Sequence, residues 1–181
     1  LMIKDKIVEE ILGKIIENKV TVNKPKVIVL SGLQYSGKSF LAEALEDKNF
    51  AHFWATKVKN DYGLSNPKML SIALEILRSA ITKKYNVVID FVNNKYEDRK
   101  KFQFLAESLK AEYNVIFLDI SKSKRLKRRE INLAKGDMPG RRLISLDQIE
   151  EFERSFERPV SDENVIVLSN NDDVALFINS L

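Results

Sequence analysis

Apolar positions along the chain fall into two kinds of pattern. Short uninterrupted runs at residues 27–31, 87–91, 115–120 and 164–168 are typical of strands that are covered on both faces, as in parallel sheets. A further strand is predicted at residues 51–55. Between the strands, apolar residues return every three or four positions, which predicts helices from residue 38 onward and over 67–83, 96–111, 122–134, 145–157 and 172–180. Strands that alternate with helices predict a three-layer α/β/α fold around a five-stranded parallel sheet.

One more helix is predicted before the first strand, over residues 3–18. Its apolar residues share one face, and Lys and Glu occupy the opposite face. We expect the apolar face to pack against the sheet; the alternative is a contact with a second copy of the chain. The sequence contains no repeat, low-complexity tract or linker, so residues 1–181 are predicted to form a single domain.

The turn after the first strand carries a phosphate-binding motif. Residues 32–39 read Gly-Leu-Gln-Tyr-Ser-Gly-Lys-Ser and match G-x-x-x-x-G-K-[ST] in full, between the strand and the helix that the motif requires. Its two glycines let backbone N–H groups point at phosphate oxygens. Lys38 is predicted to reach the β- and γ-phosphates and Ser39 to ligate Mg²⁺. The predicted cofactors are ATP and Mg²⁺, and the predicted nucleotide contacts in this turn are Gly32, Leu33, Gln34, Tyr35, Ser36, Gly37, Lys38, Ser39 and Phe40.

A carboxylate at the end of a later strand is the second candidate. Asp90 closes the run Val-Val-Ile-Asp-Phe, and the carboxyl ends of strands form the ligand edge of a doubly wound sheet. There it could hold Mg²⁺ or accept a proton, although a strand-end Asp can also simply cap the next turn. A GTPase is not indicated, because residues 94–97 read Asn-Lys-Tyr-Glu instead of ending in Asp and no Asp-x-x-Gly follows the loop.

Positive charge is concentrated in one stretch. The chain has 30 Lys and Arg against 26 Asp and Glu, but residues 122–142 contain nine basic residues and two acidic ones. A solvated helix face is the ordinary explanation of such a run. Because this one follows the fourth strand, we interpret residues 122–158 as a lid that binds anions, with residues 136–142 as its tip. The same charge could contact a nucleic-acid backbone.

Composition excludes several kinds of chemistry. Cys is absent and His52 is the single histidine, which argues against thiolate or histidine-built metal sites and against mechanisms that need two histidines. Packing of His52 and its aromatic neighbours is more probable than a role for His52 as a base. The apolar runs are far shorter than a membrane span, and charged residues interrupt any apolar signal core near the N-terminus. We therefore expect a soluble, cytoplasmic protein without a membrane partner.

Taken together, these motifs resemble those of small P-loop kinases of the polynucleotide-kinase and zeta-toxin type. The resemblance covers about residues 27–160 and depends on the loop at 32–39, Asp90-Phe-Val-Asn93, Asp98-Arg99, Arg125-Leu-Lys-Arg128-Arg129 and Glu157-Arg-Pro159. It implies a P-loop NTPase fold with a lid helix. It also implies that Asp90 lies on the acceptor side of the transferred phosphate, that Asn93 and Arg99 support that turn, and that Arg128, with Arg125 or Arg129, closes over the phosphates.

Two positions depart from the pattern of that family. Thr56 stands where the family has an Asp that can act as a base, and Val92 replaces a Thr. Asp61 or Asp90 could take over the orientation of the acceptor. The leading hypothesis is an ATP- and Mg²⁺-dependent phosphotransferase that acts on a hydroxyl of a nucleic acid, a nucleoside or another small molecule. The alternatives are an ATP-binding regulatory or adaptor module and a nucleic-acid-binding NTPase.

Overall fold

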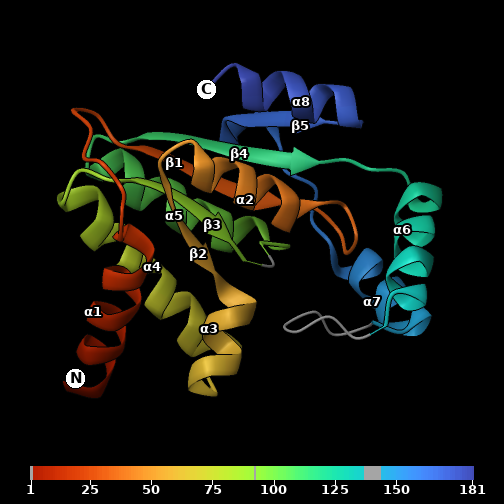
Figure 1. The fold of residues 1–181 in the computed structure, drawn as a ribbon, viewed down its shortest axis with the longest axis horizontal. Coiled ribbons are helices and arrows are strands. Elements are labelled where there is room, and N and C mark those ends of the chain that lie inside the picture. Colours follow the sequence, from red (N-terminus) through yellow and green to blue (C-terminus); the bar gives the residue numbers. More distant parts are fainter. Residues whose placement is uncertain (1, 92, 137–143) are drawn as a thin grey trace.

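The computed structural model describes residues 2–91, 93–136 and 144–181. Within them, five parallel strands form one sheet in the order β2-β3-β1-β4-β5 (Figure 1). The strands are β1 (Lys26–Ser31), β2 (Phe50–Trp54), β3 (Asn86–Asp90), β4 (Glu112–Leu118) and β5 (Val165–Leu168). The parallel five-stranded sheet predicted from the apolar runs is therefore confirmed.

The helices lie close to their predicted positions. They are α1 (Met2–Ile16), α2 (Lys38–Asp47), α4 (Asn66–Thr82), α5 (Tyr96–Ser108), α6 (Lys122–Ala134), α7 (Leu146–Ser155) and α8 (Asn171–Asn179). Two short elements were not predicted, the helix α3 (Ala55–Tyr62) and the 3-10 turn η1 (Ser161–Glu163). The helix α3 buries only Ala55 and Val58, so its sequence lacks the apolar repeat that reveals a helix.

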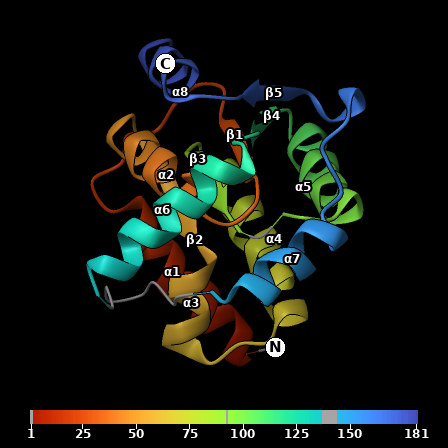
Figure 2. The ribbon, with the colours of Figure 1, turned by 90° about the vertical axis from the view of Figure 1, so that its right-hand side faces the viewer.

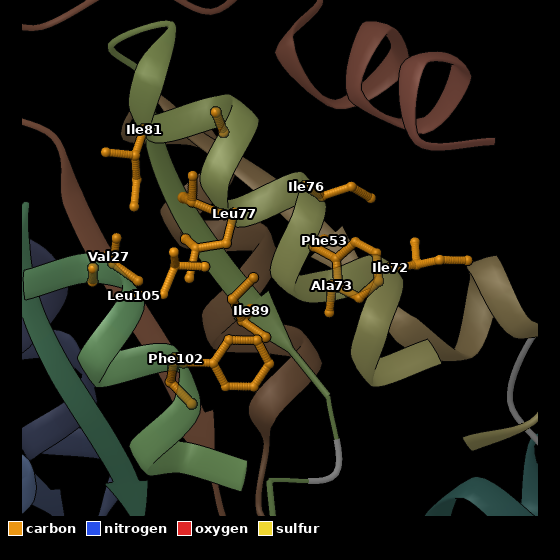
Figure 3. Close-up of a cluster of buried hydrophobic side chains, with 14 of the residues drawn as sticks. Val27, Phe53, Ile72, Ala73, Ile76, Leu77, Ile81, Ile89, Phe102 and Leu105 are labelled. Carbon is orange, nitrogen blue, oxygen red and sulfur yellow. The ribbon is translucent and has the colours of Figure 1, made fainter. Parts of the chain in front are cut away.

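Two cores cover the two faces of the sheet. On one face, helices α1, α4 and α5 pack against Val27 and Val29 of β1; Figure 3 shows part of this cluster, with Leu77 and Phe102 gathered over Ile89 of β3. On the other face, α2 and α8 pack against residues that alternate with these, including Ile28 and Leu30. Because alternate residues of each inner strand are buried on opposite faces, the strands read as continuous apolar runs.

The N-terminal helix α1 belongs to the first of these cores. Its residues Val8, Ile11 and Leu12 are buried in it, and Nζ of Lys4 donates to Oγ of Ser71 in α4 at 2.8 Å. The expected packing of the apolar face of this helix is therefore found, mainly through α4.

Helices α6 and α7 extend beyond the carboxyl ends of the strands and lie side by side there (Figures 1 and 2). Glu153 of α7 joins them, since its carboxylate accepts hydrogen bonds from Lys122 and Arg125 of α6. At the base of the excursion, the guanidinium of Arg158 donates to both carboxylate oxygens of Asp119, at 3.1 and 2.6 Å. The predicted lid tip, residues 136–142, lies outside the described residues apart from Gly136.

No helix in the described part of the chain is long and apolar enough to cross a membrane.

Candidate nucleotide site

The loop between β1 and α2 wraps tightly, as the motif predicts. Gly32 has φ of 153° and Gly37 has φ of 102°, conformations that L side chains rarely adopt. A Cβ atom on Gly32 would lie 2.8 Å from Oγ of Ser36 and 3.0 Å from the carbonyl oxygen of Leu118. Gly37 occupies the position before the first turn of α2, so the N–H groups of that turn border the loop. The motif and these glycine conformations are those of a loop whose main-chain N–H groups can cradle phosphate.

Lys38 is buried in the loop that it follows. Its Nζ donates to the carbonyl oxygens of Gly32, at 2.6 Å, and Leu33, at 3.2 Å. Burial lowers the pKa of Lys38 to about 8; the charge of Asp90 opposes this shift and the charge of Arg125 adds to it. A phosphate in the cradle would favour the protonated amine, because opposite charges at short range stabilise each other.

Arginines of α6 reach the same loop from the other side. Nη1 of Arg128 donates to the carbonyl oxygens of Tyr35, at 3.1 Å, and Ser36, at 2.8 Å. Arg125 is 4 % exposed, and its Nη1 donates to the carbonyl oxygen of Gln34 at 3.4 Å. Two guanidinium groups that were predicted to close over the phosphates are thus held against the loop.

The third arginine, Arg129, contacts the chain that precedes α7. Its Nε donates to the carbonyl oxygen of Ile144 at 2.9 Å, and the N–H of Ile144 donates to the hydroxyl of Tyr35 at 3.2 Å. Ile144, just before α7, is therefore held to α6 by Arg129 and to the phosphate loop by Tyr35.

A cavity of about 450 Å³ lies between α6 and the start of α8. Arg128 borders this cavity and connects it to the loop. Its Nη2 donates to Oδ1 of Asn171 at 3.1 Å, and its Nη1 donates to the carbonyl oxygen of Ser36 in the loop. The start of α8 is fixed by Asn170, whose side chain accepts a hydrogen bond from the N–H of Asp173. The lining residues are Lys124, Lys127, Arg128, Ile131, Asn170, Asn171 and Asp172. Sequence reasoning missed the asparagines, whose only signal was the cap of the last helix.

Asp90 lies at the carboxyl end of β3 and is 7 % exposed. Its Oδ2 is 3.4 Å from Nε2 of His52, and Nδ1 of the same ring is 3.1 Å from Oε2 of Glu46. Burial alone would lower the pKa of His52, but hydrogen bonds and charges of Asp90 and Glu46 outweigh it and raise that pKa. His52 was interpreted as a surface or packed histidine, and its contact with Asp90 depends on the strand register.

The turn after β3 is fixed by Asn93, which has φ of 46°. Its Nδ2 donates to the carbonyl oxygen of Leu30 at 2.8 Å, which ties the turn to the end of β1. Its own carbonyl oxygen accepts from Oγ of Ser31 at 3.2 Å and from Nη1 of Arg99 at 3.0 Å. Arg99 in turn forms a buried ion pair with Glu163, a residue that the sequence did not single out.

Three other residues singled out from the sequence are exposed. Asp61 of α3 pairs with Lys57 at 2.7 Å. Its negative charge also opposes the lowering of the pKa of Glu10 in α1. Thr56 is exposed in the first turn of α3. Phe40 is 64 % exposed in the first turn of α2. The structure brings Arg125 and Arg128 to the loop and Asp90 near Lys38, whereas the contacts of Asp61 are with Lys57 and Glu10.

The oxygen atoms at this site suit Mg²⁺. Mg²⁺ is usually held by one or two protein oxygens together with phosphates and waters, so it needs no cage of protein ligands. Accordingly, no group of three or more His, Cys, Asp or Glu side chains that could hold a metal occurs in the described residues. The hydroxyl of Ser39 and the carboxylate of Asp90 are hard oxygen ligands of the required kind.

The strand order β2-β3-β1-β4-β5, with the loop at residues 32–39 after β1 and a helical excursion after β4, is a fold that solved kinase structures share. The likeness to these solved structures concerns the fold. The chain is similar to a gluconokinase from Sinorhizobium meliloti 1021, with a TM-score of 0.60 and 19 % identity over 86 % of this chain and 88 % of that one.

Two further structures hold ligands. The chain is similar to the Mycobacterium tuberculosis APS kinase CysC in complex with AMPPNP and APS, with a TM-score of 0.58 and 14 % identity over 87 % of this chain and 95 % of that one. It is also similar to Chaetomium thermophilum Kti12 in complex with ADP-AlF3, with a TM-score of 0.61 and 15 % identity over 85 % and 96 %. No family model and no curated protein matches the chain. At these identities the likeness concerns the fold.

Proposed function

We propose that this protein is an ATP- and Mg²⁺-dependent phosphotransferase that moves the γ-phosphate of ATP to a hydroxyl group. One observation carries the proposal: Lys38, Arg125 and Arg128 all donate to carbonyl oxygens of the same loop, each to different residues of it. Cations held by neutral carbonyl groups at a phosphate cradle can exchange these contacts for phosphate oxygens, which bind them more strongly. Kinase neighbours with bound nucleotides, such as the APS kinase, support the same assignment by their fold.

Each residue at this site has a separate role in the proposed phosphoryl transfer. The cradle and Lys38 hold the β- and γ-phosphates, and Arg128 stabilises the charge that spreads over the equatorial oxygens in the transition state. Arg125 holds α6 to the loop, and Arg129 and Tyr35 hold the chain before α7, so water is excluded when the nucleotide is bound. Residues 122–158 act as the lid in this proposal, within a single domain that comprises residues 1–181.

Mg²⁺ bound by Ser39 and Asp90 would neutralise charge on the β- and γ-phosphates. Asp90 also has a role of its own, because its carboxylate lies at the ligand edge of the sheet and can accept a hydrogen bond from the acceptor hydroxyl. The base of the nucleotide would occupy the cavity between α6 and α8, which Arg128 joins to the loop. The asparagines at the start of α8 offer amide groups to the edge of the base.

Candidate acceptors are the 5′-hydroxyl of a nucleic acid, a nucleoside and another small molecule. One observation favours the alternative of an ATP-binding regulatory module: Thr56 lies exposed in α3 where related kinases carry an Asp, and Asp61 is paired with Lys57. Such a module would bind ATP and transfer nothing.

The test is equilibrium binding of ATP followed by an acceptor screen with γ-labelled ATP and Mg²⁺. Wild-type protein should bind ATP, Lys38→Ala should lose binding, and Lys68→Ala, which removes an exposed lysine of α4, should bind as wild type. The panel should include 5′-hydroxyl oligonucleotides, nucleosides and sugars. Label on an acceptor supports the phosphotransferase, whereas binding with neither transfer nor hydrolysis supports the regulatory module. If the wild-type protein bound no ATP, both would be wrong.

A further inference from the structure

The histidine at the centre of β2 connects two carboxylates that lie in different parts of the fold. In the sheet, Trp54 is the register partner of Asp90 and His52 is the register partner of Val88. Since residues two apart on a strand share a face, His52 and Asp90 lie on the same face of the sheet, the one that α2 covers. The imidazole therefore reaches Asp90 diagonally across neighbouring strands.

Both nitrogens of the ring have a carboxylate beside them. Nε2 lies 3.4 Å from Oδ2 of Asp90, and Nδ1 lies 3.1 Å from Oε2 of Glu46 in the last turn of α2. The ring is also stacked on Trp54, with centroids 6.3 Å apart and planes 16° apart. The side chain of His52 is 9 % exposed. Contacts at both nitrogens and at one face fix the rotation of the imidazole.

A fixed imidazole determines how the carboxylate of Asp90 is turned. An ionised carboxylate is an acceptor at both oxygens, so without a donor it can rotate between equivalent orientations. A donor at Oδ2 selects one of these orientations, in which Oδ1 points away from His52. The helix that supplies Glu46 is the one that begins with Lys38, so the same element positions the phosphate lysine and, through His52, the carboxylate.

We propose that His52 is a positioning residue for Asp90: held by Glu46, it fixes the orientation in which the Asp90 carboxylate meets the acceptor hydroxyl. The proposal rests on the proposed phosphotransferase function. Groups that orient a reacting or ligating side chain typically contribute about 10–100-fold to activity when they are removed. We expect an effect of that size on kcat and a smaller effect on the affinity for ATP, because the contacts of His52 are with Asp90, Glu46 and Trp54.

Three substitutions of His52 separate its contacts. His52→Phe keeps an aromatic ring against Trp54 and removes both hydrogen bonds. His52→Asn places an amide near the position of Nδ1, toward Glu46, and His52→Gln places one near the position of Nε2, toward Asp90. Thermal unfolding of each variant checks that it is folded. A fourth variant, Glu46→Gln, removes the carboxylate beside Nδ1. Its control is Asp47→Asn, which removes the charge of an exposed neighbour at the end of α2.

The experiment measures kcat and KM for release or transfer of labelled phosphate from Mg·ATP, together with crystal structures of the wild type and His52→Phe. We expect kcat to fall about 10–100-fold in His52→Phe and His52→Asn, to recover in His52→Gln, and to fall in Glu46→Gln but not in Asp47→Asn. The Asp90 carboxylate should be rotated in the His52→Phe crystals. An unchanged kcat in His52→Phe, an equal loss in all three His52 variants, or an unmoved Asp90 overturns the proposal. The crystal structures show the orientation of Asp90 without any turnover. The positioning role of His52 can therefore be tested even if the wild type binds no ATP and the proposed function is wrong.

Discussion

Arg99 and Glu163 form an ion pair in which both side chains are fully buried, although 64 positions separate them in the chain. Arg99 also donates to the carbonyl oxygen of Asn93, and the carboxylate of Glu163 accepts from the N–H of Val160 at 2.8 Å. The pair thereby links the turn beside the phosphate loop to the segment that returns from α7. A buried charge that loses its partner is costly, so this link should matter for stability.

Glu163→Ala should lower the free energy of unfolding by about 3–5 kcal/mol, because it leaves the guanidinium of Arg99 buried without a counter-charge. Urea denaturation followed by circular dichroism measures the change. The double variant Arg99→Met with Glu163→Leu should be more stable than Glu163→Ala, since apolar side chains leave no unpaired charge. Asp61→Ala, which breaks an exposed pair with Lys57, is the control and should change stability little. A loss as small as in this control would contradict the expected role of Glu163.

Local sequence patterns were enough to predict some of this site but not all of it. The tight loop at residues 32–39 was predicted because its motif is contiguous and its two glycines have a local reason, the positive φ that the structure shows at both. The inner strands were predicted because burial on both faces leaves no polar position. In contrast, Glu163 lies in the polar stretch Ser-Asp-Glu-Asn, where nothing distinguishes it from its exposed neighbours.

Contacts between distant residues depend on register and topology, which the sequence alone did not supply. His52 meets Asp90 only because β2 lies next to β3 with Trp54 opposite Asp90. Asp61 was a reasonable candidate by its distance along the chain from Thr56. The unpredicted helix α3 instead turns it toward Lys57.

Arg128→Ala should reduce kcat about 100–1,000-fold, the usual effect of removing one preorganised donor at a transition state. Nη1 of Arg128 already lies 2.8 Å from the carbonyl oxygen of Ser36, so the guanidinium needs little movement to reach a phosphate in the cradle. Arg128→Lys should recover only part of the rate, because an ammonium group cannot make the paired contacts of a guanidinium. Rates of labelled-phosphate release measure both.

The control for Arg128 is Lys135→Ala, which removes an exposed positive charge just beyond the last turn of the same helix. It should leave the rate unchanged. If Lys135→Ala and Arg128→Ala reduced the rate equally, the effect would come from the overall charge of α6 and the position of Arg128 would be irrelevant.

Gly32→Ala should abolish ATP binding and destabilise the protein. A Cβ atom at this position would lie 2.8 Å from Oγ of Ser36 and 3.0 Å from the carbonyl oxygen of Leu118, and the latter belongs to the backbone of β4. The loop must therefore open, at a cost of about 1–3 kcal/mol for the overpacking in addition to the strained φ. Denaturation and ATP titration measure the two effects.

Gly63→Ala is the matched control, because Gly63 also has a positive φ, of 62°, but a Cβ atom there meets nothing within 4 Å. This variant should show the backbone strain alone, about 1–2 kcal/mol, and should bind ATP normally. Equal loss of ATP binding in the two variants would mean that the close approach at Gly32 does not shape the phosphate cradle.

Binding of ATP should take up protons at alkaline pH. Burial lowers the pKa of Lys38 to about 8, and a phosphate beside the amine would raise it again. Well below pH 8 the free protein is already protonated at Lys38, so no proton is exchanged there. Near pH 8.5 part of the free protein has lost this proton and regains it on binding, so the affinity for ATP should fall as the pH rises through 8. Titration calorimetry in two buffers with different ionisation enthalpies measures the uptake.

Lys38→Arg isolates this effect, because a guanidinium stays protonated throughout the range. Its affinity for ATP is expected to be lower than that of the wild type, since the longer and planar group fits the cradle less well, but it should not vary between about pH 7 and pH 9 and should show no proton uptake. The terminal phosphate of ATP is fully ionised at about pH 8.5 and contributes no exchange there. The same uptake in wild type and Lys38→Arg would assign the proton to another group, and no uptake in the wild type would mean that Lys38 does not meet the phosphates.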